Sequence, residues 1–231
     1  MSGIYVHIPF CKSRCKYCDF FSTTHLEKQT QYTESVLSEW SDRRKELMGG
    51  IQTIYIGGGT PSTMSVELLR RIIGAIKPDT QDAEIEVTIE ANPGDITLEK
   101  ARAWRALGIN RLSIGIQSFN DHLLQLIGRR HSSSEAIQAV KDAQAAGFDN
   151  ISIDLMYALP DQTMAIWQDD IAQALALGVQ HISSYGLIYE EGTVLTTLLE
   201  HGIIEAVDEE IEMQMYDYLV EQLTTYGFQH Y

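Results

Sequence analysis

The chain contains three cysteines, Cys11, Cys15 and Cys18, and all of them lie in one short stretch near its start. A short loop has no core in which three apolar thiols could be buried, and an odd number of cysteines cannot all pair as disulfides. The spacing therefore indicates a metal site. A structural zinc ion usually takes four protein ligands, so a closed zinc site would need a remote fourth residue. An iron–sulfur cluster fits better, because three thiolates on a four-iron cluster leave one iron open to a small molecule.

A second candidate for chemistry is the run of three glycines at residues 57–59, which Thr60 and Pro61 follow. Consecutive glycines cost backbone entropy, and a bare turn needs only one or two of them. We therefore expect the backbone of this loop to approach a ligand closely. No Lys-Ser or Lys-Thr pair follows at the spacing of a phosphate-binding loop.

Elements must position these loops, and short β-branched runs alternate with helical stretches along the chain. This alternation predicts an α/β fold of parallel strands joined by right-handed crossovers. The predicted strands are residues 3–9, 52–57, 84–91, 110–117, 150–157 and 181–188. The predicted helices are residues 27–48, 65–77, 97–107, 133–146, 164–177 and 208–226.

Within the predicted strands, aliphatic residues alternate with small or polar ones, as Leu112 and Ile114 do with Ser113 and Gly115. In a barrel of βα units the aliphatic set must pack against the helices. The polar set would then line the interior as a cavity, where an ordinary barrel is filled by branched side chains. This pattern favours a partial (β/α)6 barrel, and a doubly wound sheet is the alternative.

Several polar side chains fall on the predicted inward face. Glu90 and Gln117 end the third and fourth strands, and Asp154 lies in the fifth. A carboxylate there could accept hydrogen bonds from an amine or from ribose hydroxyls, although a carboxylate at a strand end is often only solvated. Tyr5 and His7 share the inward face of the first strand.

The spacing C-x3-C-x2-C, with Tyr17 before the last cysteine, resembles the signature of the radical S-adenosylmethionine (SAM) superfamily. Residues 5–10, Tyr-Val-His-Ile-Pro-Phe, are similar to the branch that contains oxygen-independent coproporphyrinogen III oxidases and heme chaperones of the HemW type. The resemblance implies a radical SAM barrel with a [4Fe-4S] cluster on the three cysteines, whose remaining iron is chelated by the amino and carboxylate groups of SAM.

The resemblance also implies which residues surround SAM, since residues 57–61 match the GGGTP loop of the family and other positions match its polar pocket. These residues are Tyr5, Tyr17, Gly58, Gly59, Thr60, Glu90, Gln117, Arg129 and Asp154. Arg130 and His131 are expected on a helix surface instead.

Two departures from the oxidase pattern favour the HemW type. Asp19 and Phe20 follow Cys18 where the oxidases carry a further cysteine, and the chain starts four residues before Tyr5, where they have a long extension. Ala158 stands where relatives usually have glycine, a minor departure. We therefore expect heme as cargo, an unknown heme-accepting protein and an electron donor for the cluster. Oxidative decarboxylation of coproporphyrinogen III is the alternative, and a radical SAM enzyme acting on RNA is a third.

The formal net charge of −15 argues against nucleic acid as a partner, because phosphates are neutralised by clustered Lys and Arg. No apolar run approaches the roughly 20 residues that span a bilayer, and the start lacks the features of a secretory signal. We expect a cytoplasmic protein with reduced thiols. Residues 1–192 are expected to form the core barrel and residues 193–231 to begin a C-terminal helical domain that continues beyond residue 231, as family members do.

Overall fold

The computed structural model describes residues 2–47, 49–77 and 85–231 of the chain. The strands are β1 Ser2–Ile8, β2 Ile51–Gly58, β3 Glu86–Ala91, β4 Arg111–Gln117, β5 Ile151–Tyr157 and β6 His181–Gly186. The helices are α1 Gln29–Arg43, α2 Val66–Ile76, α3 Leu98–Ala106, α4 Asp121–Leu126, α5 Ser133–Ala145, α6 Met164–Ala176, α7 Val194–Glu200 and α8 Glu209–Thr225.

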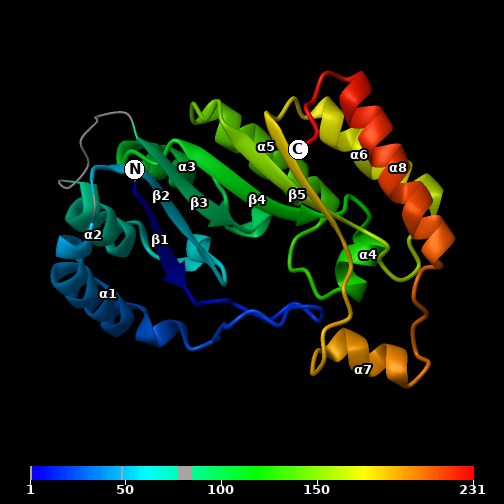
Figure 1. The fold of residues 1–231 in the computed structure, drawn as a ribbon, viewed down its shortest axis with the longest axis horizontal. Helices are drawn as coiled ribbons and strands as arrows, with labels where there is room; N and C mark the ends of the chain where they lie inside the picture. Colours follow the sequence, from blue (N-terminus) through cyan, green and yellow to red (C-terminus); the bar gives the residue numbers. More distant parts are fainter. Residues whose placement is uncertain (1, 48, 78–84) are drawn as a thin grey trace.

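All strands belong to one parallel sheet whose order is β1-β2-β3-β4-β5-β6. Each strand therefore pairs with its neighbour in sequence, and the order never reverses as it must in a doubly wound sheet. Among the described residues β1 and β6 are the two edges of the sheet, so the barrel is open between them (Figure 1). The partial (β/α)6 barrel is confirmed, and the doubly wound alternative is wrong.

The predicted strands agree with the observed strands to within two residues at each end. Residue 84 of the third predicted strand and residue 48 of the first predicted helix lie outside the described residues. The remaining five predicted helices agree to within one residue at each end, whereas α1 is shorter than predicted and is flanked by 3-10 turns at Leu26–Lys28 and Arg44–Glu46. Helices α4 and α7 were not predicted.

The aliphatic face of the sheet is buried, as the alternation predicts. Val87, Leu112, Ile114 and Ile153 are fully buried in the main core. The opposite face carries the small and polar residues, which pair across the sheet: Glu90 lies beside Ser113, and Gly115 lies beside Asp154. The sequence pattern thus leaves a polar interior in which a site can form.

A second, smaller apolar cluster lies beyond the carboxyl ends of β5 and β6. It comprises Leu123, Ile127, Met156, Leu159, Leu187 and Leu195, with Tyr17 packed against it. This cluster joins α4 and α7 to the loop that follows β1, which Figure 1 shows reaching toward both helices. The cysteine loop is therefore supported by this apolar cluster through Tyr17.

Helix α8 packs against α6 and contributes to the main core. Met215 and Leu219 are buried, and Trp167 Nε1 donates a hydrogen bond to the Met215 carbonyl at 2.8 Å. The buried face of this helix is narrow, because Ile211 and Tyr226 are exposed. The domain division at residue 192 stays a prediction, and both α7 and α8 contact residues that precede it.

Candidate functional site

The cysteine loop, residues 9–25, is closed at its base by backbone hydrogen bonds. The amide of Cys11 donates to the Thr23 carbonyl at 2.9 Å, and the amide of Thr23 donates to the Pro9 carbonyl at 2.7 Å. Further along, the Lys16 amide donates to the Ile127 carbonyl after α4 at 2.9 Å. All three cysteines are free thiols; Cys11 is buried and the other two are partly buried. The loop is thus fixed at both its base and its tip.

The glycine loop after β2 packs directly against the cysteine loop. The Gly59 amide donates to the Ile8 carbonyl and the Thr60 amide to the Phe10 carbonyl, each at 2.8 Å. A Cβ atom on Gly59 would lie 3.0 Å from Cys11 Sγ and 2.8 Å from the Pro9 carbonyl carbon. Glycine is therefore required here by the approach of the protein's own loop, a reason that sequence alone did not indicate.

Glu90 is held at the end of β3 by two donors. Tyr55 Oη donates to Glu90 Oε1 at 2.8 Å, and the Gly58 amide donates to Glu90 Oε2 at 2.9 Å. Burial raises the pKa of Glu90, although both hydrogen bonds oppose the shift. Gly57 leaves room for this carboxylate, because a Cβ there would lie 2.8 Å from Glu90 Oε1.

Three predicted polar residues converge around Gly115 of β4. A Cβ atom on Gly115 would lie 3.0 Å from Gln117 Nε2, 3.2 Å from Arg129 Nη2 and 3.8 Å from Asp154 Oδ2. Burial raises the pKa of Asp154, which also accepts a hydrogen bond from Ser113 Oγ at 3.3 Å. Because Gly115 has no side chain, the three polar groups can come close together above its backbone, which forms the floor of the polar interior.

Gln117 sits at an irregularity of β4, where the pairing with β5 shifts its register. Its φ angle of 74° is left-handed, a conformation that costs a non-glycine residue roughly 1–2 kcal/mol. Strain of this kind collects at functional sites. The side chain is buried and accepts a hydrogen bond from Tyr185 Oη at 2.8 Å.

Arg129 links the polar interior to the cysteine loop. Its Nη1 donates to Cys15 Sγ at 3.4 Å, and its Nη2 donates to the Gly115 carbonyl. Its Nε is buried and has no hydrogen-bond partner among the described residues. A buried guanidinium with a donor to spare suits an anionic group of a ligand.

One cavity of about 190 Å³ gathers these groups. All the predicted site residues line it except Tyr5, which is 58% exposed and stacks on Tyr55 with ring centroids 6.0 Å apart. We call it the cysteine cavity. Its lining also includes residues that the sequence did not single out as ligand contacts: Ser13, Arg14, Phe20, Ser22, Ala91, Asn92, Ser113, Gly115, Gly128, Arg130 and Tyr185.

Of the missed residues, Ser113 and Gly115 could have been found from the strand alternation, which placed both on the inward face. Tyr185 carried no such signal, since its strand β6 shows no clear alternation of polar and apolar residues. Arg130 is exposed, but it lies between α4 and α5 rather than on a helix surface, and it also lines the cysteine cavity. The prediction for His131 is wrong. His131 is 3% exposed, and its Nε2 is 3.1 Å from the Ile116 carbonyl. Burial, with the nearby charge of Arg129, lowers the pKa of His131 to about 4.

Asp95 anchors the cysteine loop from the side. Its buried carboxylate contacts Lys12 Nζ at 2.6 Å, Arg130 Nη2 at 3.2 Å and Ser62 Oγ at 2.9 Å. Burial alone would raise the pKa of Asp95, but the Lys12 hydrogen bond and the Arg130 charge outweigh it and lower the pKa. Four separate segments therefore meet at one carboxylate.

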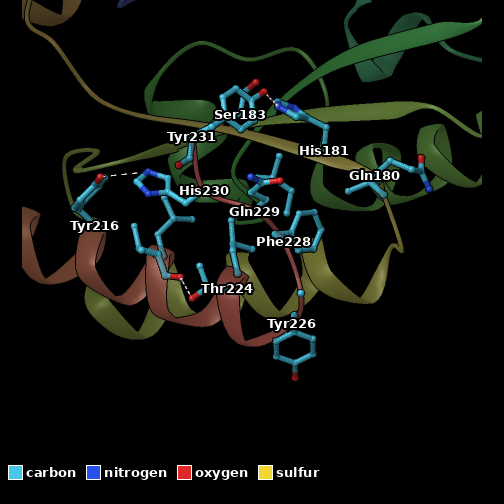
Figure 2. A pocket seen from close by; sticks show the side chains of 17 residues that line it. Gln180, His181, Ser183, Tyr216, Thr224, Tyr226, Phe228, Gln229, His230 and Tyr231 are labelled. Atoms are coloured by element: carbon cyan, nitrogen blue, oxygen red, sulfur yellow. Dashed lines mark hydrogen bonds between the residues drawn. The ribbon is translucent and has the colours of Figure 1, made fainter.

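A larger cleft of about 680 Å³ lies between β6, α8 and the C-terminal residues. Figure 2 shows Tyr216 and His230 joined across it by a hydrogen bond of 3.5 Å. This cleft contains none of the predicted site residues. The chemistry implied by the cysteines therefore belongs to the smaller cavity.

The family model of the radical SAM superfamily matches residues 5–174, which is most of the barrel. The chain belongs to the radical SAM superfamily. Membership implies a [4Fe-4S] cluster and SAM as cofactors. Cluster ligation gives each thiolate its own iron, so the three sulfurs need not meet at one point. Among the described residues, no three His, Cys, Asp or Glu are grouped to hold a single metal ion. The donor set of three free thiols beside Arg129 fits both cofactors.

This radical SAM chain is similar to curated heme chaperones over its full length. It is 39% identical over 233 residues to the heme chaperone HemW of Lactococcus lactis and 37% identical over 238 residues to that of Bacillus subtilis. Both alignments cover 100% of this chain, and the chain spans 60% and 62% of the two relatives. The predicted resemblance to the HemW type is confirmed.

Among solved structures, the chain is similar to the coproporphyrinogen III oxidase HemN of Escherichia coli, a radical SAM enzyme. The TM-score is 0.86 at 26% identity, and the match covers 98% of this chain and 53% of that one. No helix in the described parts is long and apolar enough to cross a membrane.

Proposed function

We propose that Cys11, Cys15 and Cys18 ligate a [4Fe-4S] cluster and that the cysteine cavity holds SAM beside it. The observation that carries the proposal is that three free thiols, two inward carboxylates and a buried guanidinium line one cavity. The cluster and SAM supply one-electron chemistry when both are bound and the cluster is reduced. The protein supplies ligation, orientation and the exclusion of water.

Each polar group has a role that its contacts support. Arg129 Nε would bind the carboxylate of SAM, since it is a buried donor with no other partner among the described residues. Each oxygen of Glu90 keeps a second lone pair for an amine or a ribose hydroxyl. Asp154 and Gln117 would accept further donors around Gly115. Gly58, Gly59 and Thr60 would form one wall, and Tyr17 would lie beside the adenine.

Tyr5 has a different place in this proposal. Because it lies outside the cavity lining and stacks on Tyr55, it would act on Glu90 through the Tyr55 hydroxyl. Tyr5 then supports the carboxylate and makes no direct contact with SAM in this arrangement.

For the whole protein we propose a heme chaperone of the HemW type, which binds heme and passes it to an acceptor protein. Similarity to HemW proteins along the entire chain supports this function. Phe20, two residues after Cys18, where the resembled oxidases have a further cysteine, supports it as well. The alternative is the decarboxylation of coproporphyrinogen III, which the TM-score of 0.86 to HemN favours. A cytoplasmic location, an electron donor for the cluster and a barrel that ends near residue 192 belong to the same proposal.

The cofactor part is tested by anaerobic reconstitution with iron and sulfide. We expect about four irons per chain and an electron paramagnetic resonance signal that changes when SAM is added. The matched control is the Cys18→Ser variant, which should lose cluster content. Zinc in the purified protein, or a signal that ignores SAM, would contradict the proposal.

The heme part is tested by titrating heme into the protein and following absorbance, then passing the complex through gel filtration. The chaperone proposal expects heme to stay with the protein. In a parallel reaction, the reconstituted protein is incubated with SAM, a reductant and coproporphyrinogen III. Formation of protoporphyrinogen would establish the oxidase instead.

A further inference from the structure

Two of the three cysteine sulfurs accept hydrogen bonds from side chains outside their own loop. Thr60 Oγ1 donates to Cys11 Sγ at 3.3 Å, and Arg129 Nη1 donates to Cys15 Sγ at 3.4 Å. Cys18 differs, since its donor is the backbone amide of Phe20 within the loop. The two outer donors come from separate βα units, one after β2 and one after α4.

The Thr60 hydroxyl is held in place by the backbone on which it sits. The amides of Gly59 and Thr60 both donate to carbonyls that flank the start of the cysteine loop, each at 2.8 Å. The absent Cβ of Gly59 lets the two loops touch, because such an atom would lie 3.0 Å from Cys11 Sγ. The donor therefore cannot drift away from the sulfur without breaking the contact between the loops.

Arg129 is fixed in a similar way. Gly128 has a φ angle of 78°, and a Cβ there would lie 3.2 Å from Lys16 Cγ, so this turn also lies flat on the cysteine loop. The guanidinium is anchored by its bond to the Gly115 carbonyl. It always carries a positive charge, and that charge faces the Cys15 sulfur.

Hydrogen bonds to cluster sulfurs raise the reduction potential of an iron–sulfur centre. One-electron reduction adds one negative charge, which the thiolates share, so a donor stabilises the reduced form more than the oxidised form. We propose that Thr60 and Arg129 set the reduction potential of the cluster by donating to Cys11 and Cys15. This inference rests on the proposed ligation and adds a role to residues expected only to contact SAM.

The first test compares Thr60→Val with Thr60→Ser. Valine matches the shape of threonine but has no hydroxyl, whereas serine keeps the donor. The reconstituted proteins are titrated anaerobically with dithionite, without SAM, and the reduced cluster is followed by electron paramagnetic resonance. We expect Thr60→Val to reduce about tenfold less readily at equilibrium, which is a midpoint potential about 59 mV more negative for one electron. Thr60→Ser should remain close to the wild type.

The second test removes the charge beside Cys15. Arg129→Gln should shift the midpoint in the same direction and by at least as much, since a charge and a donor are both lost. Arg102→Gln on α3 is the matched control, because it changes the net charge equally at an exposed position of a helix outside the cavity lining. Its midpoint should not move.

Iron content separates the possible failures. If the wild type assembles no four-iron cluster, the proposed function fails. If wild type, Thr60→Val and Arg129→Gln all hold the cluster and share one midpoint potential, the role of the two donors is overturned while cluster ligation stands. An equal shift in Thr60→Ser and Thr60→Val would also overturn it, because the hydroxyl would then be irrelevant.

Discussion

At the scale of single residues, buried carboxylates outside the cavity hold the site together. Asp95 pairs with Lys12 of the cysteine loop and with Arg130, the residue after Arg129. It thereby links the two segments. The side chain of Asp95 is fully buried, whereas that of Lys12 is 46% exposed. Removing the buried partner leaves two cations without their counter-charge, which costs more than losing a surface pair.

We expect Asp95→Asn to lower the free energy of unfolding of the cluster-free protein by about 2–3 kcal/mol, measured by urea titration. Asparagine keeps the shape and one acceptor, so the loss reports the charge. The control is Glu39→Gln, which removes an exposed i,i+4 pair with Arg43 and should change stability by about 0.5 kcal/mol or less. Equal effects of the two variants would show that Asp95 is no anchor.

Asp170 on α6 makes stability depend on pH. It accepts a hydrogen bond from the Phe119 amide at 2.6 Å and another from Ser118 Oγ at 2.9 Å, which fixes the turn after Gln117. Burial raises the pKa of Asp170 from 3.8 to about 6. A raised pKa means that the folded state binds the proton more tightly, so this contribution to stability is full below the unfolded pKa and is lost as pH rises through 6.

We therefore expect the stability of the wild type relative to Asp170→Asn to fall as pH rises from 5 to 7, by on the order of 1.4 kcal/mol, and to level off above pH 7. Urea unfolding at half-unit steps from pH 5 to 7.5 measures it. Asp149→Asn, at an exposed carboxylate after α5, is the control for the loss of one negative charge. A constant difference between wild type and Asp170→Asn would contradict the assignment.

At the scale of elements, the long strands and helices followed from the sequence because their patterns are strong. Thr97 caps α3 by accepting from the Lys100 amide, and Gly108, which follows the end of the predicted helix, has a φ angle of 83°. Helices α4 and α7 were not predicted, because six or seven residues are too few to show the periodicity of a helix. Their local signals were the N-caps Asn120 and Thr193 and the glycines that follow each helix, Gly128 and Gly202.

The site was predictable where residue type and strand position agreed, as for Glu90, Gln117 and Asp154. It was not predictable where a contact joins distant loops, as between Arg129 and Cys15, which are 114 positions apart. The three glycines were expected to make room for a ligand. Residues 57 and 59 also make room for Glu90 and Cys11, which no sequence pattern indicated, and the approach of this loop to a ligand stays a prediction.

A backbone feature of the turn after β5 gives a third prediction. Ala158 is buried with a φ angle of 58°, a conformation that glycine adopts without penalty. We expect Ala158→Gly to raise the free energy of unfolding by about 0.5–1 kcal/mol in urea, once the entropy that glycine gains in the unfolded chain is subtracted. The matched Ala172→Gly variant, exposed within α6, should lose about 1 kcal/mol. A loss in both variants would mean that the turn is unstrained.

At the scale of the whole molecule, the chain has 32 acidic residues but only 17 Lys and Arg residues, so its net charge is strongly negative. The resulting charge repels itself in the compact state, and salt screens that repulsion over a Debye length of about 10 Å at 0.1 M. Buried pairs such as Asp95 with Lys12 are screened much less. Salt should therefore stabilise the fold without weakening the ion pair between Asp95 and Lys12 of the cysteine loop.

We expect the melting temperature at pH 7.5 to rise by roughly 2–4 °C between 20 and 300 mM NaCl, which corresponds to about 1 kcal/mol. Differential scanning calorimetry measures it. Choline chloride at equal ionic strength should give the same rise, because screening does not depend on the identity of the cation. A rise with sodium alone would indicate specific ion binding.

The distance in sequence between Cys15 and Arg129 has a consequence for synthesis. The thiols leave the ribosome first, and at about 5–20 residues per second the arginine follows roughly 6–23 s later. Until that segment arrives, neither the guanidinium nor the floor at Gly115 exists to shelter the sulfurs. Iron delivered to a nascent chain before the fourth βα unit emerges would therefore meet thiols without the hydrogen-bond donor that Arg129 gives Cys15.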